Sequence, residues 1–153
     1  MKRIVLLTAL AAMIAAAMAL SGVAQARPIS EPADAKCAKL AIKTLGPSYN
    51  PSNYNFVGGT EGAVGDDNFD LSGTDDPDVI CGFGGNDSIN FVAAGDIFLG
   101  GAGDDFVNIN SGTVYGDEGD DEVGFNFGTF NGWDDFDRVI NNFGTITNVE
   151  QVI

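Results

Sequence analysis

The fold of this chain is decided by one short phrase that recurs between Gly82 and Val139. The phrase reads G-F-G-G-N-D-S-I from Gly82, G-G-A-G-D-D-F-V from Gly100, G-D-E-G-D-D-E-V from Gly116 and G-W-D-D-F-D-R-V from Gly132. Each copy is a turn rich in glycine and acidic residues, followed by an aspartate and, two positions later, a branched apolar residue. Recurrence of such a phrase indicates a repeat architecture.

The interval between the copies predicts the size of the repeating unit. The copies begin at Gly82, Gly100, Gly116 and Gly132, so the later two intervals are equal and the first is slightly longer. A unit of this length, with two short apolar runs, predicts an all-β fold, a short parallel β-roll or β-solenoid whose 16–18-residue coils each hold two strands and two turns. The acidic turns are expected to stack along one edge of the roll.

Two further residue patterns recur at the same spacing as the later copies, and they predict the structure of the opposite edge of the roll. They are a glycine before threonine, at Gly112, Gly128 and Gly144, and an asparagine, at Asn110, Asn126 and Asn142. The Gly-Thr pairs are expected to form tight turns that carry no carboxylate. The asparagines are expected to stack as an amide ladder, which is a structural role.

The repeated phrase resembles the nonapeptide G-G-x-G-x-D-x-U-x of the calcium-binding repeats-in-toxin (RTX) family, and the resemblance covers about half of the mature chain. It implies a small secreted protein with about three calcium ions on one edge. In that family each ion lies between adjacent turns of the same edge and takes one aspartate from each turn, plus backbone carbonyls. The fourth copy departs from the pattern, because Trp133 and Phe136 stand where small residues are usual.

The residue types fit this chemistry, because calcium prefers about six to eight oxygen ligands in flexible loops. The aspartates that end the turns are the principal predicted ligands: Asp87, Asp105, Asp121 and Asp137. Backbone or secondary ligands are expected at Gly82, Gly84, Asn86, Gly100, Asp104, Gly116 and Asp120. Asp78 and Asp96, on the opposite edge, are weaker candidates. The alternative for all of them is a solvated acidic loop, because aspartate and glycine favour turns anyway.

The N-terminal segment, from Met1 to Ala26, has the pattern of a secretory signal peptide. Lys2 and Arg3 precede an almost wholly apolar run from Ile4 to Leu20, and Ala24-Gln25-Ala26 is a small-x-small cleavage site. Cleavage after Ala26 predicts a secreted, extracellular protein, and a retained membrane anchor is the alternative. This signal differs from the uncleaved C-terminal export signal that is typical of RTX proteins.

Charge limits the partners of the mature chain. Loss of Lys2 and Arg3 leaves five basic and 22 acidic residues, a net charge of −17. Nucleic acid and anionic membranes are therefore not expected as partners. No later apolar stretch is long enough to span a bilayer, so no membrane contact is expected after cleavage. The sequence identifies no protein or polysaccharide partner.

The segment 27–55 is expected to carry a helix over about 34–45 that caps the first coil, with Asp34 as its N-cap and Gly46-Pro47 as its end. Cys37 and Cys81 are the only cysteines, and a disulfide is the default in an exported protein, with two free thiols as the alternative. Tyr49 and Tyr54 are expected to pack over the first coil, and a platform on which a sugar stacks is the alternative interpretation. The β-roll is expected to occupy 56–153, and 57–71 reads as a degenerate first coil.

An enzyme is not expected. The chain has no histidine and no G-x-S-x-G motif, and its acidic pairs fall inside the repeats. Two interpretations stay open. One is a calcium-binding protein in which ion binding drives folding. The other is a surface or adhesive solenoid that contacts a wall, a polysaccharide or ice through a threonine row, with calcium only structural. That row is Thr113, Thr129 and Thr145.

Overall fold

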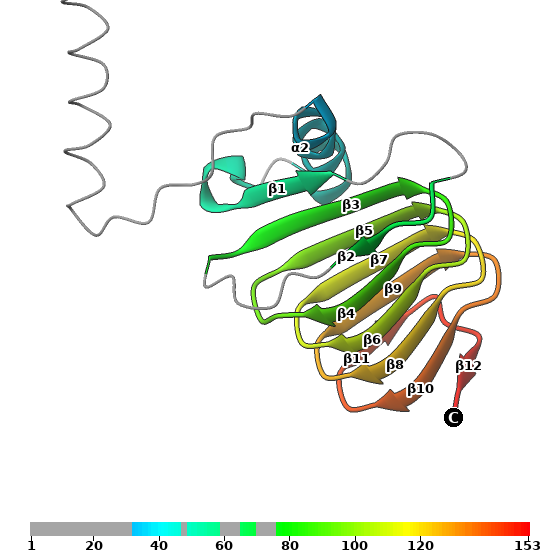
Figure 1. Ribbon diagram of the computed structural model, residues 1–153. Coiled ribbons are helices and arrows are strands. Elements are labelled where there is room, and N and C mark those ends of the chain that lie inside the picture. The colour runs from blue at the N-terminus through cyan, green and yellow to red at the C-terminus, as the bar shows by residue number, and fades with distance from the viewer. Residues whose placement is uncertain (1–31, 47–48, 59–64, 70–75) are drawn as a thin grey trace, which may run out of the picture.

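The structure is a computed structural model that describes residues 32–46, 49–58, 65–69 and 76–153. Two six-stranded parallel sheets face each other and form a β-solenoid of about five turns (Figure 1). The first sheet holds β1 (Asn55–Gly58), β3 (Asp78–Gly84), β5 (Ile97–Ala102), β7 (Thr113–Glu118), β9 (Thr129–Asp134) and β11 (Thr145–Thr147). The second holds β2 (Asn68–Phe69), β4 (Ser88–Val92), β6 (Phe106–Asn110), β8 (Glu122–Asn126), β10 (Arg138–Asn142) and β12 (Gln151–Val152). The predicted fold class is confirmed.

The register follows the repeat, so equivalent residues of successive coils are neighbours. In the first sheet Ile80 pairs with Phe98, which pairs with Val114. In the second sheet the apolar residue of each phrase pairs with that of the next, as Val107 does with Val123. These columns point inward and form one core between the sheets. Alternation of inward and outward residues along each strand makes this possible.

The first interval between the repeated phrases is longer than the later ones for a local reason. Between β4 and β5 the chain makes a four-residue turn, 93–96, whereas only Ser111 and Gly112 separate β6 from β7. Asp96 closes the longer turn, because its backbone N–H donates to the carbonyl of Ala93 at 3.0 Å. Its Oδ2 also accepts from the N–H of Ala93 at 3.1 Å. The later coils have the shorter turn.

The helix α2 (Pro32–Leu45) packs on the outer face of the first sheet at its N-terminal end, over β1 and β3 (Figure 1). It begins at Pro32, so Asp34 is not its N-cap, and proline suits the first turn of a helix. It ends at Leu45 as predicted, where Gly46 has φ +78°. Cys37 bonds to Cys81 of β3.

A second apolar cluster lies between α2 and the first sheet. Val79, Cys81 and Leu99 point outward from the sheet and are fully buried by this contact. Tyr49 and Tyr54 lie with ring centroids 5.0 Å apart and pack against the same cluster, as expected. A short 3-10 helix, Pro51–Asn53, lies between the two tyrosines in the chain. Its first turn is closed by the side chain of Asn50.

The predicted amide ladder is present at the opposite edge. Asn110 Nδ2 donates to Asn126 Oδ1 and Asn126 Nδ2 donates to Asn142 Oδ1, both at 2.8 Å. Asn110 and Asn126 are fully buried. The rings of Phe127 and Phe143 stack beside the ladder, with centroids 5.1 Å apart and planes 9° from parallel.

Some sequence predictions concern residues that the structure does not describe. The signal peptide, 1–26, and the segment 27–31 lie outside the described residues, as do 59–64 and 70–75 in and after the predicted first coil. The parts of that coil that are described do pair as a coil. Val57 of β1 pairs with Ile80, and Phe69 of β2 pairs with Ile89. Among the helices of the described residues, none has the length and apolar character to cross a membrane.

Candidate functional site

The acidic turns stack along one edge of the solenoid, where each strand of the first sheet passes to the second. These turns are residues 85–87, 103–105, 119–121 and 135–137. The two sheets pair in parallel on either side of them, so each turn lies directly beside the equivalent turn of the next coil. Each turn contributes one buried aspartate, and together these four residues form what we call the inner column: Asp87, Asp105, Asp121 and Asp137.

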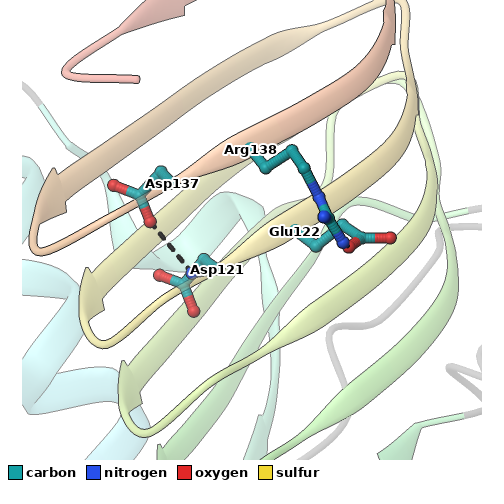
Figure 2. A network of polar contacts seen from close by, with 4 residues as sticks. All are labelled: Asp121, Glu122, Asp137 and Arg138. Carbon is teal, nitrogen blue, oxygen red and sulfur yellow. Dashed lines mark hydrogen bonds and ion pairs between the residues drawn. The ribbon is translucent and has the colours of Figure 1, made fainter. Parts of the chain in front are cut away.

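One oxygen of each inner-column carboxylate fixes the backbone of the preceding coil. The N–H of Asp87 donates to Oδ1 of Asp105 at 2.8 Å, and the N–H of Asp105 donates to Oδ1 of Asp121 at 2.8 Å. The N–H of Asp121 donates to Oδ1 of Asp137 at 3.0 Å, as Figure 2 shows. These carboxylates are at most 4% exposed. The inner column therefore ties each coil to the next through the side chain.

The other oxygen, Oδ2, is buried at all four positions and has no hydrogen-bond partner within the described residues. It faces the glycine that opens the same phrase. A methyl group on Gly100 would lie 2.0 Å from Oδ2 of Asp105 and 2.7 Å from the carbonyl oxygen of Gly116 in the next coil. Gly82 and Gly116 have the same surroundings. Each glycine thus lets a carboxylate oxygen and a carbonyl oxygen of the next coil converge beside its Cα, where any side chain would clash with both.

Burial changes the ionisation of these carboxyls. Desolvation is the largest cause, and it raises the pKa of Asp105 to about 7 and that of Asp121 to about 8. It also raises the pKa of Asp137, to about 6, and raises that of Asp87. Hydrogen bonds from the backbone oppose the shift, and neighbouring aspartates add to it. The column is therefore unfavourable in its charged form unless a cation compensates it.

A second, exposed column runs outside the first, through the residue that precedes each inner aspartate. The N–H of Asn86 donates to Asp66 Oδ1 at 2.9 Å, and that of Asp104 donates to Asn86 Oδ1 at 3.1 Å. The N–H of Asp120 donates to Asp104 Oδ1 at 3.1 Å. The predicted secondary positions Asn86, Asp104 and Asp120 therefore lie together at the surface of the same edge. Their side chains hold the turns in register.

The fourth turn keeps its inner aspartate although its outer residues differ. The backbone of Trp133 has φ 87°, close to that of Gly101, which occupies the equivalent position two strands earlier. Its side chain is 53% exposed, and that of Phe136 is 51% exposed. Neither side chain is among the three atoms that a methyl group on Gly132 would approach most closely. The outer column loses its carboxylate at Phe136, whose N–H still donates to Asp120.

The remaining predicted positions belong to neither column. Gly84 ends β3 and is buried in register with Ala102. Asp78 and Asp96 are buried together on the opposite edge, where the N–H of Asp78 donates to Asp96 Oδ1 at 3.0 Å. Both oxygens of Asp96 accept backbone hydrogen bonds, whereas Oδ2 of Asp78 has no partner within the described ranges. Desolvation also raises the pKa of Asp96.

Arg138 carries the positive charge nearest in sequence to the inner column, but it points elsewhere. It lies in register with Glu122 on the neighbouring strand and forms an ion pair with that residue. In Figure 2 this pair lies to one side of Asp121 and Asp137. The guanidinium is therefore engaged by Glu122 across the second sheet.

The inner column is longer than the sequence analysis anticipated. At its start, the N–H of Asp67 donates to Asp87 Oδ1 at 2.7 Å. At its end, the N–H of Asp137 donates to Glu150 Oε2 at 2.8 Å. Glu150 carries a detectable signal, because it precedes Val152 by two positions, as Asp137 precedes Val139. The spacing was missed because the residue is a glutamate and because its coil is shorter than the earlier ones.

The donor set fits a hard cation such as calcium. Carboxylate oxygens without a hydrogen-bond partner and carbonyl oxygens converge beside the same glycines, within the described residues. Within the described ranges no three acidic, histidine or cysteine side chains form a metal-binding group. An ion here would therefore take carboxylates from adjacent coils and complete its shell with backbone carbonyls, and water where solvent reaches it. Comparison of the chain with protein-family models, curated proteins and solved structures found no match in any of the three.

Proposed function

We propose that this protein is a secreted calcium-binding protein that holds calcium between successive coils along the acidic edge and couples ion binding to folding. The supporting observation is the row of buried Oδ2 atoms without a hydrogen-bond partner among the described residues. Buried polar atoms in native proteins nearly always have a partner, so a row that lacks one calls for a ligand. The resemblance of the repeats to the RTX nonapeptide agrees with this choice of ion.

The mechanism is thermodynamic linkage. Without ions the folded chain must bury carboxyl groups one coil apart, about 4.8 Å, and their charged forms are both desolvated and mutually repelled. A calcium ion between two coils compensates this charge and bridges the coils. Because the unfolded chain has no such arrangement, binding stabilises only the folded state. Extracellular modules of this kind bind calcium at about 10⁻⁴–10⁻³ M, which is the expected range here.

The interior aspartates carry the largest share of this function. Asp105 and Asp121 each have an inner-column neighbour in the coil before and in the coil after. Each therefore serves two intervals between coils. Replacing either with asparagine keeps an acceptor for the backbone N–H but removes the charge that an ion requires.

The test is calcium titration of the chelated mature chain, followed by far-UV circular dichroism and calorimetry, with magnesium in parallel. We expect a rise in β-sheet signal that saturates with calcium and not with magnesium, because magnesium gives up its water reluctantly. Asp105→Asn and Asp121→Asn should weaken calcium binding most. Asp76→Asn removes the same charge from an exposed position outside both columns and should leave binding nearly unchanged.

A chelated chain that is already fully folded, and to which calcium binds without effect or not at all, would remove the calcium-linked account. The second candidate would then move forward. It is a surface or adhesive solenoid, favoured by the register of Thr113, Thr129 and Thr145, which lie side by side on three successive strands. The last two are exposed. An evenly spaced hydroxyl row on a flat sheet suits an ordered surface such as a polysaccharide or ice.

The second candidate has its own test. Thr129→Lys places a long charged side chain in the middle of the threonine row, and the exposed strand position tolerates it. Binding to insoluble polysaccharides and inhibition of ice recrystallisation are measured beside the unaltered protein. Loss of such an activity in Thr129→Lys, with the calcium response retained, would assign the row to surface contact. Activity that survives the substitution would speak against that role.

A further inference from the structure

The last interval of the inner column repeats the geometry of the earlier ones with residues outside the repeated phrase. A methyl group on Gly132 would lie 1.9 Å from Oδ2 of Asp137 and 2.3 Å from the carbonyl oxygen of Asn148. At Gly116 the corresponding atoms are Oδ2 of Asp121, at 1.9 Å, and the carbonyl oxygen of Gly132, at 2.8 Å. The carbonyl of Asn148 thus takes the place that a glycine carbonyl has in the other coils.

Glu150 takes the place of the next inner-column aspartate. Its Oε2 accepts the N–H of Asp137 at 2.8 Å, just as Oδ1 of Asp137 accepts the N–H of Asp121 at 3.0 Å. The separation is 13 residues, whereas the preceding coil has 16. Gln151 pairs with Arg138, so Glu150 stands beside Asp137 in the same register that places Asp137 beside Asp121, although its coil is shorter.

The backbone around these two residues is fixed. Asn148 has φ 49°, a left-handed conformation that asparagine tolerates, and its Nδ2 donates to Asn131 Oδ1 at 3.0 Å. The N–H groups of Glu150 and Gln151 both donate to the carbonyl of Asp137, at 3.2 and 3.0 Å. The carbonyl of Asn148 and the carboxylate of Glu150 are therefore held at opposite ends of one short, anchored loop.

Asp137 supplies the independent sign of a ligand. It is fully buried, and its Oδ2 has no hydrogen-bond partner within the described part of the chain. That oxygen and the carbonyl oxygen of Asn148 converge beside Gly132. A charged oxygen acceptor, a carbonyl acceptor and a second carboxylate one coil away are a donor set for a hard divalent cation.

We propose that the roll ends in an additional calcium site formed by Asp137, Glu150 and the backbone carbonyl of Asn148. The site rests on the proposed function, since it uses the same chemistry as the interior intervals. It differs from them in two respects. Glu150 is exposed, so water completes the shell, and its longer side chain loses more conformational freedom on binding. The ion at this site is therefore the most weakly held of the column.

The chain carries a reporter beside this site. Trp133 is the only tryptophan, and it directly follows Gly132. Terbium, a trivalent surrogate for calcium, emits when a nearby excited tryptophan transfers energy to it. Titration of the mature chain with terbium, with tryptophan selectively excited, follows ions near the last coils. Calcium stoichiometry from equilibrium dialysis counts all bound ions.

Glu150→Gln separates a ligand from a structural cap. Glutamine keeps an oxygen acceptor for the N–H of Asp137 but removes the charge. We expect Glu150→Gln to bind one calcium ion fewer than the unaltered chain and to lose the weakest phase of terbium emission. Its calcium-induced circular dichroism should be retained. Glu118→Gln, an exposed glutamate outside both columns, is the matched control and should bind as many ions as the unaltered chain.

Unchanged calcium stoichiometry and terbium emission in Glu150→Gln would overturn the proposal and leave Glu150 as a cap. If Glu150→Gln fails to fold even with calcium, Glu150→Asp decides, because it keeps the charge and shortens the reach. If the proposal holds, Glu150→Asp should bind the last ion more weakly but still measurably. Binding as strong as in the unaltered chain would contradict the proposed site. If the unaltered chain binds no calcium at all, the proposed function itself is wrong. That result is distinct from any change seen only in the Glu150 variants.

Discussion

Each inner-column aspartate uses its two oxygens for different purposes. Oδ1 of Asp121 holds the backbone N–H of Asp105, and that bond needs only an acceptor. Oδ2 lies against Gly116 with no partner among the described residues, and this position is the one that charge would serve. Asparagine would satisfy the first role alone. Substitution of aspartate by asparagine therefore separates the structural role from ion binding at each position.

The pH dependence of stability follows from the raised pKa values. In chelator, Asp105 and Asp121 have pKa values of about 7 and about 8 in the folded chain, against 3.8 for an unperturbed carboxyl. The folded state therefore holds more protons than the unfolded state across this range, so its stability decreases as the pH rises from 4 to 8. Urea unfolding at several pH values measures this.

Calcium should reverse that trend, because the ion requires the charged carboxylates that high pH supplies. Calcium affinity is expected to increase between pH 5 and pH 8, close to the pKa of about 8 for Asp121. A chelated chain that grows more stable as the pH rises would contradict the burial of neutral carboxyls. Calcium affinity independent of pH would contradict their role as ligands.

Gly116→Ala tests the space beside the column. The added methyl group would lie 1.9 Å from Oδ2 of Asp121, and the backbone of Gly116 is not left-handed, so the effect is one of space alone. We expect a loss of about 1–3 kcal/mol in unfolding free energy and a weakened calcium response. Gly95→Ala is the control. It has φ +103° but its nearest neighbour is 3.8 Å away, so it should strain the backbone and spare calcium binding.

At the scale of the elements, the two edges of the roll are held by different ladders. The acidic edge is tied by carboxylates to backbone N–H groups, and the opposite edge by amides to one another. Asn126 Nδ2 donates to Asn142 Oδ1 and also approaches the carbonyl of Thr145 at 3.3 Å. The amide ladder has no titratable group, so it should be independent of pH and calcium.

Asn126→Ala should therefore destabilise the roll without changing calcium affinity in the folded state. It removes two amide hydrogen bonds, one of them fully buried, while Asn110 Nδ2 keeps the carbonyl of Thr129 and Asn142 Oδ1 keeps the N–H of Gly144. Loss of the two bonds should cost about 1–3 kcal/mol in unfolding free energy. Asn108→Ala removes an exposed amide pair with Asn90 and should change stability by no more than about 0.5 kcal/mol. Equal losses in the two variants, measured by urea unfolding, would argue against a special role for the buried ladder.

The disulfide fixes α2 to β3 across 44 residues of chain. Replacing both cysteines with serine should lower the unfolding free energy by about 2–4 kcal/mol, because the unfolded chain is no longer constrained. All four inner-column aspartates follow Cys81 in the chain, so calcium titration of the folded variant should give the same stoichiometry. Thermal unfolding in calcium measures the first effect. A lost calcium response would show that α2 supports the acidic edge directly.

Sequence periodicity was sufficient to predict the coils, because every coil repeats the same inward residues and the same glycine turns. It also predicted the asparagine ladder and the stacking of the acidic turns. It failed where the chain leaves the period. Glu150 completes the column from a coil of 13 residues, and the role of Asn148 is a backbone carbonyl that no side-chain pattern reveals. The start of α2 was misplaced because Pro32 opens the helix ahead of Asp34.

At the scale of the whole molecule, the excess of acidic residues opposes folding. The full chain carries 22 acidic and seven basic residues, and the repeats hold most of the acids. Such self-repulsion weakens when salt screens it. In chelator, sodium chloride at about 1 M, where the Debye length is about 3 Å, should raise the urea midpoint. Calcium at millimolar concentration should raise it further, because screening reaches buried carboxylates poorly. Equal effects would mean that calcium acts only as a general counter-ion.

The hydrogen bonds of the inner column all run in one direction, opposite to those of the outer column, where the later coil donates to the earlier one. In the inner column the earlier coil donates its backbone N–H, and the later coil supplies the side chain that receives it, from Asp67 through to Glu150. In a chain that leaves a ribosome or a membrane pore with its N-terminus first, the N–H of each inner aspartate therefore has no side-chain acceptor until the next turn emerges. Each inner-column hydrogen bond therefore forms only when the following turn arrives. A chain stalled at any point has this bond missing only at its newest turn.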